Sequence, residues 1–188
     1  MAVAAVRFDA GQPEVGVDVV STRERDGDEQ VRSFGGWDGF VSAHAPLLAA
    51  DEVDRLRRWP GCDGEKRRAL LALWCLREAY VKMCGEALLA PWLADLCFTR
   101  FRPTTELDGD WSRLDGEEVG EDELGIMLGG EPVRDVRMRL KALARGFMVC
   151  VAVKHVPDHV ELGKWRWVGL EDILAFAESN GAVDSEQG

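Results

Sequence analysis

The longest regular pattern of apolar and polar positions in the chain runs from Ala69 to Glu86. Apolar side chains recur there at the spacing that places them on one face of an α-helix. They are Leu70, Leu73, Leu76, Tyr80 and Met83. Gly85 is typical of the residue that ends a helix. The pattern therefore predicts one long amphipathic helix from about Gly64 to Cys84.

Several other apolar stretches have the length and composition of β-strands. Residues Val15 to Val20 form a short run that is rich in β-branched side chains. Residues 133–143 alternate between apolar and polar, and residues 147–154 are continuously apolar, as in a central strand. Arg145 and Gly146 lie between them and predict a hairpin turn. Further strands are expected at Asp95 to Arg102 and Trp165 to Val168.

Shorter helices are expected at Trp37 to Leu48, Asp51 to Trp59 and Leu170 to Glu178. The segment from Ser21 to Gly36 is charged and contains glycines, which is typical of a surface loop. One long helix laid on a mainly antiparallel sheet gives a two-layer α+β module. We therefore expect residues 1–188 to form a single module of this class.

Two segments have the composition of solvated chain. Residues 104–131 are strongly acidic and contain several glycines, but they lack the register of a calcium-binding loop. This composition predicts a solvated, mobile insertion. Residues 179–188 are expected to form a polar tail.

Composition and charge exclude several classes of partner. The chain has 188 residues, of which 46% are hydrophobic, and no stretch has the continuous apolar length of a membrane span. The formal net charge of −11 disfavours a nucleic-acid partner, because binding to phosphate backbones requires clustered cations. The five cysteines are odd in number and lack a C-x-x-C spacing, which predicts reduced thiols in a cytoplasmic protein.

The charged residues of the long helix offer candidate chemistry. Trp74, Glu78 and Lys82 are spaced four apart, so their side chains lie along one flank of the helix. The carboxylate of Glu78 could hold a metal ion and the ammonium of Lys82 a phosphate. A glutamate followed four residues later by a lysine is also a common surface pair. Asp18, the one charge in its strand, lies either at a solvent-facing edge or in a site.

Two motifs carry a resemblance to a known family. The run Trp74-Cys75-Leu76-Arg77-Glu78-Ala79-Tyr80-Val81-Lys82 resembles the W-(S/C)-x-K-E-(A/S)-x-x-K signature of the 4'-phosphopantetheinyl transferase superfamily. Its continuation through Leu93 is similar to fungal members of the Sfp-type class. Upstream, Gly16-Val17-Asp18-Val19 resembles the family element G-(V/I)-D-(V/I). The resemblance covers only the C-terminal of the two modules that Sfp-type enzymes contain.

The resemblance implies a reaction and roles for particular residues. The phosphopantetheine arm of coenzyme A is transferred to a serine of an acyl or peptidyl carrier protein, with Mg²⁺ at the diphosphate. Asp18 and Glu78 match the metal carboxylates, and Glu78 is also the candidate base. Lys82 matches the lysine at the leaving diphosphate. Arg77 replaces a family lysine and is expected, with Lys82, to contact coenzyme A.

The chain also departs from the family pattern. Val20 stands where bacterial members carry a third carboxylate. The first module, with its S-H-(Q/S) segment, is expected to lie outside this sequence. The chain is then either an active transferase that completes its cleft by pairing with another chain, or a truncated, non-catalytic half that only docks carrier proteins. Acidic carriers would dock on two basic clusters, which are otherwise solvated helix faces: Arg55, Arg57, Arg58, Lys66, Arg67 and Arg68.

Overall fold

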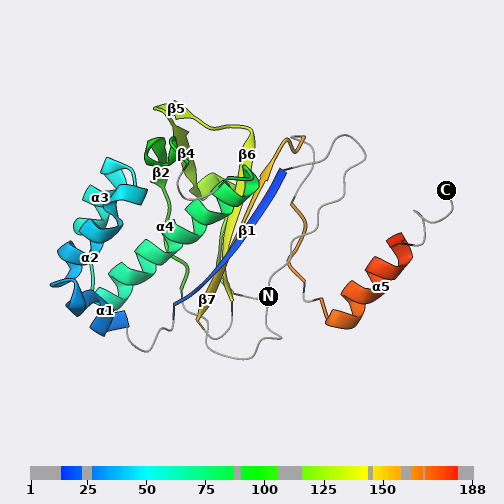
Figure 1. Cartoon of the computed structure of the whole chain (residues 1–188), viewed down its shortest axis with the longest axis horizontal. Coiled ribbons are helices and arrows are strands. Elements are labelled where there is room, and N and C mark those ends of the chain that lie inside the picture. Colours follow the sequence, from blue (N-terminus) through cyan, green and yellow to red (C-terminus); the bar gives the residue numbers. More distant parts are fainter. Residues whose placement is uncertain are drawn as a thin grey trace.

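The computed structural model of the chain describes residues 14–22, 27–86, 90–105, 116–143, 146–157, 162–166 and 168–181. One long helix lies across an antiparallel sheet, and shorter helices gather at one end of it (Figure 1). This arrangement confirms the predicted α+β class with a helix packed on a mainly antiparallel sheet.

The main sheet has the strand order β1-β7-β6-β3. Strand β1 (Glu14–Ser21) pairs with β7 (Phe147–Lys154), and β7 pairs with β6 (Val136–Leu143) as the predicted hairpin. Gly146 closes that hairpin with a φ of 70°, a conformation that glycine adopts without strain. The continuously apolar β7 lies between two partners, and most of its side chains are buried.

Helix α4 (Asp63–Met83) is the predicted long helix. It packs on β1 and β7, and Figure 1 shows it crossing the sheet face along these strands. Its predicted apolar stripe is buried, and Leu73 and Leu76 have no exposed surface. The contact forms because the stripe meets the inward side chains of β7, which include Cys150 and Ala152.

Three short helices cover the end of α4 that begins at Asp63. Helices α2 (Trp37–His44) and α3 (Ala50–Arg57) correspond to the two predicted helices, and a short 3-10 turn, η1 (Ala45–Leu47), separates them. The expectation of a loop from Ser21 to Gly36 is wrong for part of that segment, because α1 (Gly27–Ser33) is helical. One side chain explains the difference: Val31 is buried against the core, with 1% of its surface exposed.

A second sheet contains β2 (Leu96–Arg100), β4 (Gly125–Leu128) and β5 (Glu131–Pro132), in that order. The 3-10 turn η2 (Leu93–Asp95) leads into β2. Strand β2 lies within the predicted strand at residues 95–102, and its edge next to α3 is bonded to side chains instead of another strand.

The predicted solvated insertion is wrong for residues 116–131. They contain β3 (Glu118–Val119), the 3-10 turn η3 (Glu121–Glu123) and β4, and β5 begins at Glu131, while residues 106–115 lie outside the described part. The acidic side chains pair with arginines that are 15 to 21 residues away in the sequence: Glu117 and Glu123 bind Arg102, and Glu121 binds Arg137 at 2.5 Å. Composition suggested solvation because the partners of these carboxylates are distant in the chain.

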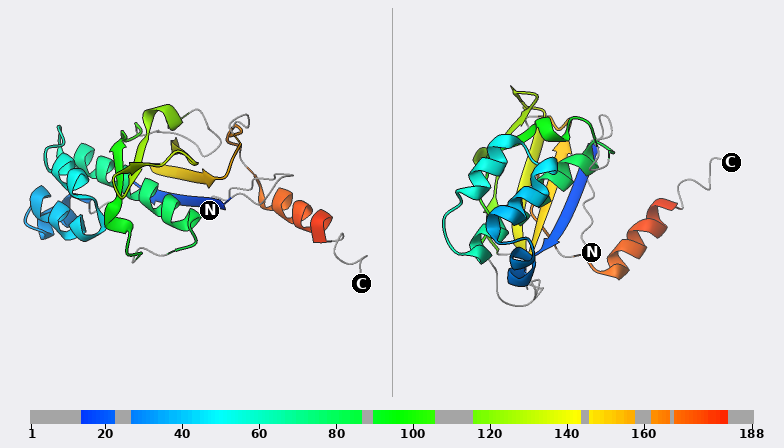
Figure 2. Two further views of the ribbon diagram at one scale, coloured as in Figure 1. Left: turned by 90° about the horizontal axis from the view of Figure 1, so that it is seen from above. Right: turned by 60° about the vertical axis from the view of Figure 1, so that its left-hand side comes forward.

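The C-terminal region differs from the prediction in one element. No strand forms at the described residues 165, 166 and 168, while the indole of Trp165 donates to Glu118 at 2.6 Å. Helix α5 (Leu170–Gly181) contains the predicted helix, and it extends away from the sheet in both views of Figure 2. The predicted tail overlaps its last residues, and residues 182–188 lie outside the described part. Within that part, none of the helices combines the length and the apolar character needed to cross a bilayer.

Candidate functional site

The candidate site forms where β1 and α4 come close together, and Gly16 permits that approach. A Cβ atom at Gly16 would lie 2.0 Å from the carbonyl oxygen of Ala79 and 2.3 Å from the backbone nitrogen of Met83. No other residue fits such a contact, because both neighbours are backbone atoms of a helix. The register of β1 then places Asp18, two residues further on, on the same face toward α4.

Asp18 and Lys82 form an ion pair across this contact. The ammonium of Lys82 donates to Oδ1 of Asp18 at 2.6 Å. Only 11% of the Asp18 side chain is exposed, whereas 48% of Lys82 is exposed. The hydrogen bond to Asp18 raises the pKa of Lys82 above its usual value. The lysine therefore remains a cation that reaches from solvent to a nearly buried carboxylate.

Glu78 lies one turn before Lys82 and faces the same cluster. Its side chain is half-buried, and this burial raises its pKa above the usual value. The negative charge of Asp18 raises the pKa further, while the charge of Lys82 lowers it. The structure thus brings together three predicted residues from two distant segments, Asp18, Glu78 and Lys82. The described residues contain no group of three or more His, Cys, Asp or Glu suited to a metal ion.

A buried thiol fixes the strand at this point. The thiol of Cys75 donates to the backbone carbonyl of Asp18 at 3.4 Å, and Cys75 has no exposed surface. Burial raises its pKa well above that of a free thiol, so Cys75 stays protonated and can donate this weak bond. Sequence reasoning assigned no role to Cys75 or to Gly16. The sequence did contain a signal for both residues, because Cys75 lies within the Trp74 to Lys82 motif and Gly16 begins the Gly16 to Val19 motif.

The structure places Arg77 away from this cluster and corrects its predicted role. Its side chain has no exposed surface and forms a buried ion pair with Glu52 of α3. It also donates to the carbonyl oxygens of Leu93 at 2.7 Å and Leu96 at 2.9 Å. A guanidinium without exposed surface cannot contact coenzyme A, so the expectation for Arg77 is wrong in this structure. Arg77 instead joins α4 to α3 and β2.

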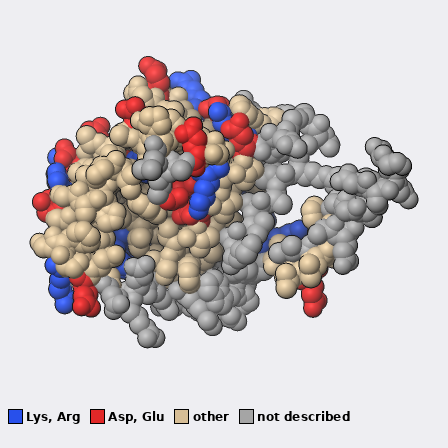
Figure 3. Space-filling view, in the orientation of Figure 1, with Lys and Arg blue, Asp and Glu red and all other residues tan. Residues whose placement is uncertain are grey.

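Trp74 lines a hollow beside the cluster. Its ring packs edge-on against His44, with 6.2 Å between ring centroids, and remains half-buried. A cavity of about 390 Å³ lies between this ring and β1. Val20 lines the same cavity, so the position where bacterial family members carry a third carboxylate is apolar here. In Figure 3, red and blue side chains lie together near the C-terminal end of α4, within a mainly uncharged surface.

The two basic clusters do not form a single solvated surface. Arg67 is buried and donates to the carbonyl oxygen of Thr22 at 3.1 Å. Arg55 donates to the carbonyl oxygen of Thr99 at 2.7 Å, and Arg57 pairs with Asp38 at 2.9 Å. The six residues therefore do not form one continuous solvated surface, because Arg67 is buried and both Arg55 and Arg67 bond backbone groups of the fold.

Comparison with known protein families identifies the family to which the chain belongs. The sequence model of the 4'-phosphopantetheinyl transferase superfamily matches residues 14–119, more than half of the chain, including β1 and α4. The chain belongs to this superfamily. The match confirms the resemblance carried by the motifs around Asp18 and Glu78.

Curated fungal proteins are similar to the chain. It is 40% identical over 172 residues to 4'-phosphopantetheinyl transferase 1 of Fusarium mangiferae, covering 87% of this chain and 54% of that protein. It is 30% identical over 157 residues to the 4'-phosphopantetheinyl transferase NpgA of Emericella nidulans, covering 76% of this chain and 45% of that protein. The chain therefore spans about half the length of these two relatives.

Proposed function

We propose that the chain takes part in transferring the 4'-phosphopantetheine group of coenzyme A to a serine of an acyl or peptidyl carrier protein. The observation that carries the proposal is the convergence of Asp18, Glu78 and Lys82 at the contact of β1 with α4. Two carboxylates and an ammonium in one place suit a reaction at a diphosphate. The names of the fungal relatives support this reaction class.

The donor atoms of the cluster fit Mg²⁺. Asp18 and Glu78 offer carboxylate oxygens, which are the ligands that this hard cation prefers, and Mg²⁺ usually keeps several waters in its shell. The two carboxylates are close enough for the charge of Asp18 to raise the pKa of Glu78. These two residues would hold the ion. When bound, the ion offsets negative charge on the phosphate oxygens.

Glu78 and Lys82 have separate roles in the proposed reaction. The carboxylate of Glu78 accepts the proton of the attacking serine hydroxyl. The serine oxygen forms a bond to the β-phosphorus as the bond to the bridging diphosphate oxygen breaks. Lys82 stabilises the departing oxygen, because an ammonium has three donors and Asp18 takes one. Adenosine 3',5'-bisphosphate leaves.

A transfer assay tests this proposal. The chain is incubated with coenzyme A, Mg²⁺ and a carrier protein, and mass spectrometry measures the mass gained by the carrier. We expect the parent chain to modify the carrier and Glu78→Gln to abolish transfer. Glu86→Gln is the matched control, because Glu86 is exposed and bonds the indole of Trp92. Full activity of Glu78→Gln would refute the assignment.

A second candidate function is a non-catalytic half that only docks carrier proteins. It is favoured by one observation, that the ammonium of Lys82 already occupies Oδ1 of the Asp18 carboxylate at 2.6 Å. Coenzyme A affinity separates the two candidates, since a docking half should bind coenzyme A poorly with or without Mg²⁺. In either case we propose a cytoplasmic location, where the chain's cysteines remain reduced. All five cysteines are free in the structure.

A further inference from the structure

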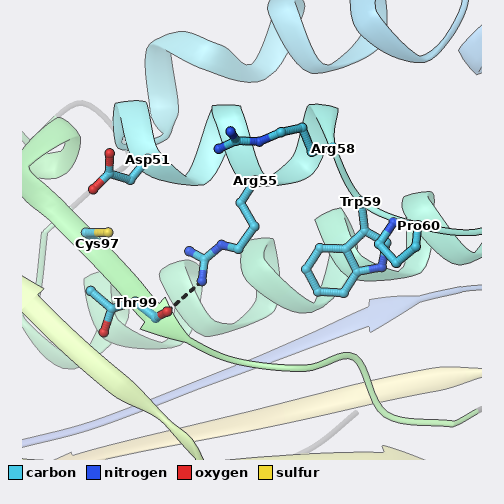
Figure 4. Close-up of a pocket in the computed structure, with 7 residues that line it drawn as sticks. All are labelled: Asp51, Arg55, Arg58, Trp59, Pro60, Cys97 and Thr99. Atoms are coloured by element: carbon cyan, nitrogen blue, oxygen red, sulfur yellow. Dashed lines mark hydrogen bonds between the residues drawn. The ribbon is translucent and has the colours of Figure 1, made fainter.

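A groove between α3 and β2 shares no residue with the Asp18, Glu78 and Lys82 cluster. It has a volume of about 630 Å³. Figure 4 shows α3 along one side and β2 along the other, with Trp59 and Pro60 at one end and Asp51 at the opposite end. Its other lining residues are Arg55, Arg58, Cys97 and Thr99.

The groove carries positive charge that the fold does not neutralise. The chain has 34 acidic and 23 basic residues, and arginines such as Arg57 and Arg77 have carboxylate partners. Among the described residues, neither Arg55 nor Arg58 forms an ion pair. Both donate to backbone carbonyl oxygens, and the Nε atom of Arg55 is buried without a hydrogen-bond partner.

The end of the groove near Trp59 also offers a flat apolar wall. The ring of Trp59 stacks on Phe101, with 5.5 Å between centroids and an interplanar angle of 25°. The guanidinium of Arg55 lies 4.7 Å from the centroid of the same phenyl ring. These contacts hold the indole and the guanidinium in fixed positions, so a ligand that binds there need not order them.

We propose that this groove docks an acidic segment of a partner protein, with an aspartate or glutamate at Arg58 and an apolar side chain against Trp59. A peptide is favoured over a small enclosed ligand because Arg58, Pro60 and Thr99 are exposed, whereas small-molecule sites bury most of their ligand. Tryptophan and arginine are also the residues that most often dominate binding between proteins. The carboxylate of Asp51 repels acidic groups, so the acidic residue of the partner segment should bind away from Asp51, near Arg58.

The test uses the full chain and a fluorescently labelled peptide that has aspartates on both sides of a leucine. Fluorescence anisotropy gives the dissociation constant. We expect Arg58→Glu to weaken binding about tenfold or more, because it replaces attraction by repulsion at the groove. Arg57→Glu is the matched control, because Arg57 pairs with Asp38 outside the groove, and it should change affinity less than about twofold. Asp51→Asn should strengthen binding.

Other outcomes would overturn the proposal. If Arg57→Glu and Arg58→Glu weakened peptide binding equally, the peptide would be held by general attraction to positive charge and not by the groove. Equal binding of peptides with asparagine for aspartate, or glycine for leucine, would show that neither recognised group matters. Displacement of the peptide by inorganic phosphate would identify a small-anion site. Absence of peptide binding would show that the groove does not dock an acidic segment.

Discussion

At the residue scale, each member of the candidate site depends on a neighbour that the motif alone does not reveal. Gly16 lets β1 approach α4, the thiol of Cys75 holds the carbonyl of Asp18, and Lys82 neutralises the Asp18 carboxylate. Glu78 differs from these residues because its charge is disfavoured in the folded chain. Burial and Asp18 both raise its pKa.

Glu78→Gln should therefore separate activity from stability. The folded pKa of Glu78 lies above its usual value of 4.5, so its favourable contribution to stability is present below pH 4.5 and is lost as pH rises through the folded pKa. At pH 7 the glutamine variant should melt at the same temperature as the parent chain or slightly higher. Calorimetric melting at pH 7 and pH 4 measures this, and a clearly lower melting temperature at pH 7 would contradict it.

Gly16→Ala should destabilise the fold strongly, because the added methyl group meets backbone atoms that cannot move without displacing α4. We expect a loss of about 3 kcal/mol in the free energy of unfolding, the upper end of the usual cost of overpacking. Urea denaturation measures it. Gly64→Ala is the control: among the described residues outside the helix backbone, the nearest atom to a Cβ there is the Cys62 sulfur at 3.9 Å, so the change should be neutral or stabilise α4 by up to about 1 kcal/mol. Equal losses of stability in Gly16→Ala and Gly64→Ala would refute the close contact between β1 and α4 at Gly16.

At the element scale, α4 is fixed on two sides by different chemistry. One flank meets β1 through Gly16 and Asp18, and another meets α3 and β2 through the buried pair of Arg77 with Glu52. Glu52 also accepts from the backbone nitrogens of Ala49 at 2.9 Å and Phe98 at 2.7 Å. This network satisfies the edge of β2 without a further strand.

Arg77→Met tests the second attachment. It leaves the Glu52 carboxylate buried without its cation and removes one hydrogen bond from each of two backbone carbonyls, those of Leu93 and Leu96. We expect a cost of about 3 to 5 kcal/mol in the free energy of unfolding. The control is Arg57→Met, because Arg57 pairs with an Asp38 side chain that is 79% exposed, and its loss should cost less than about 1 kcal/mol. Similar costs for the two variants would show that burial of the pair does not matter.

The acidic segment gives a prediction of opposite sign to that for Glu78. Hydrogen bonds from Thr105, together with Arg102, lower the pKa of Glu117 from 4.5 to about 2. Its contribution to stability is therefore present above pH 4.5 and is lost as pH falls toward 2. Glu117→Gln should lower the melting temperature by a few degrees at pH 7 and not at pH 2.

The exposed Glu131 provides the control for this experiment. Glu131→Gln should leave the melting temperature unchanged at both pH values. A Glu117→Gln effect that persists at pH 2 would mean that the charge of the carboxylate is not responsible.

At the scale of the whole molecule, periodicity predicted most elements correctly. Long apolar patterns determined α4 and the hairpin of β6 and β7, because each buries a continuous face. The helix at Gly27–Ser33 and the strands within residues 116–131 were not predicted. They depend on single buried residues such as Val31 and on ion pairs between distant segments, such as Glu121 with Arg137, which leave no local pattern.

The candidate site was also predictable only in part, because local spacing shows which residues share a helix face but not which distant residues they contact. Spacing placed Glu78 and Lys82 on one flank of a helix, and the family motif added Asp18. Arg77 lies four residues after Leu73 and three before Tyr80, so its spacing already placed it on the buried face, but no local pattern identified the carboxylate that pairs with it there. Its partner Glu52 precedes it by 25 residues. Neighbouring positions on a helix face different directions, so adjacency to Glu78 did not make Arg77 part of the site.

The central claim is that Asp18 and Glu78 together hold one divalent ion. The most direct measurement is calorimetric titration of Mg²⁺, with coenzyme A present, into the parent chain, Asp18→Asn, Glu78→Gln and the control Glu86→Gln. The claim predicts that the parent chain and Glu86→Gln bind alike and that each of the other variants binds about tenfold more weakly or worse. Unchanged Mg²⁺ affinity in Asp18→Asn and Glu78→Gln would contradict it.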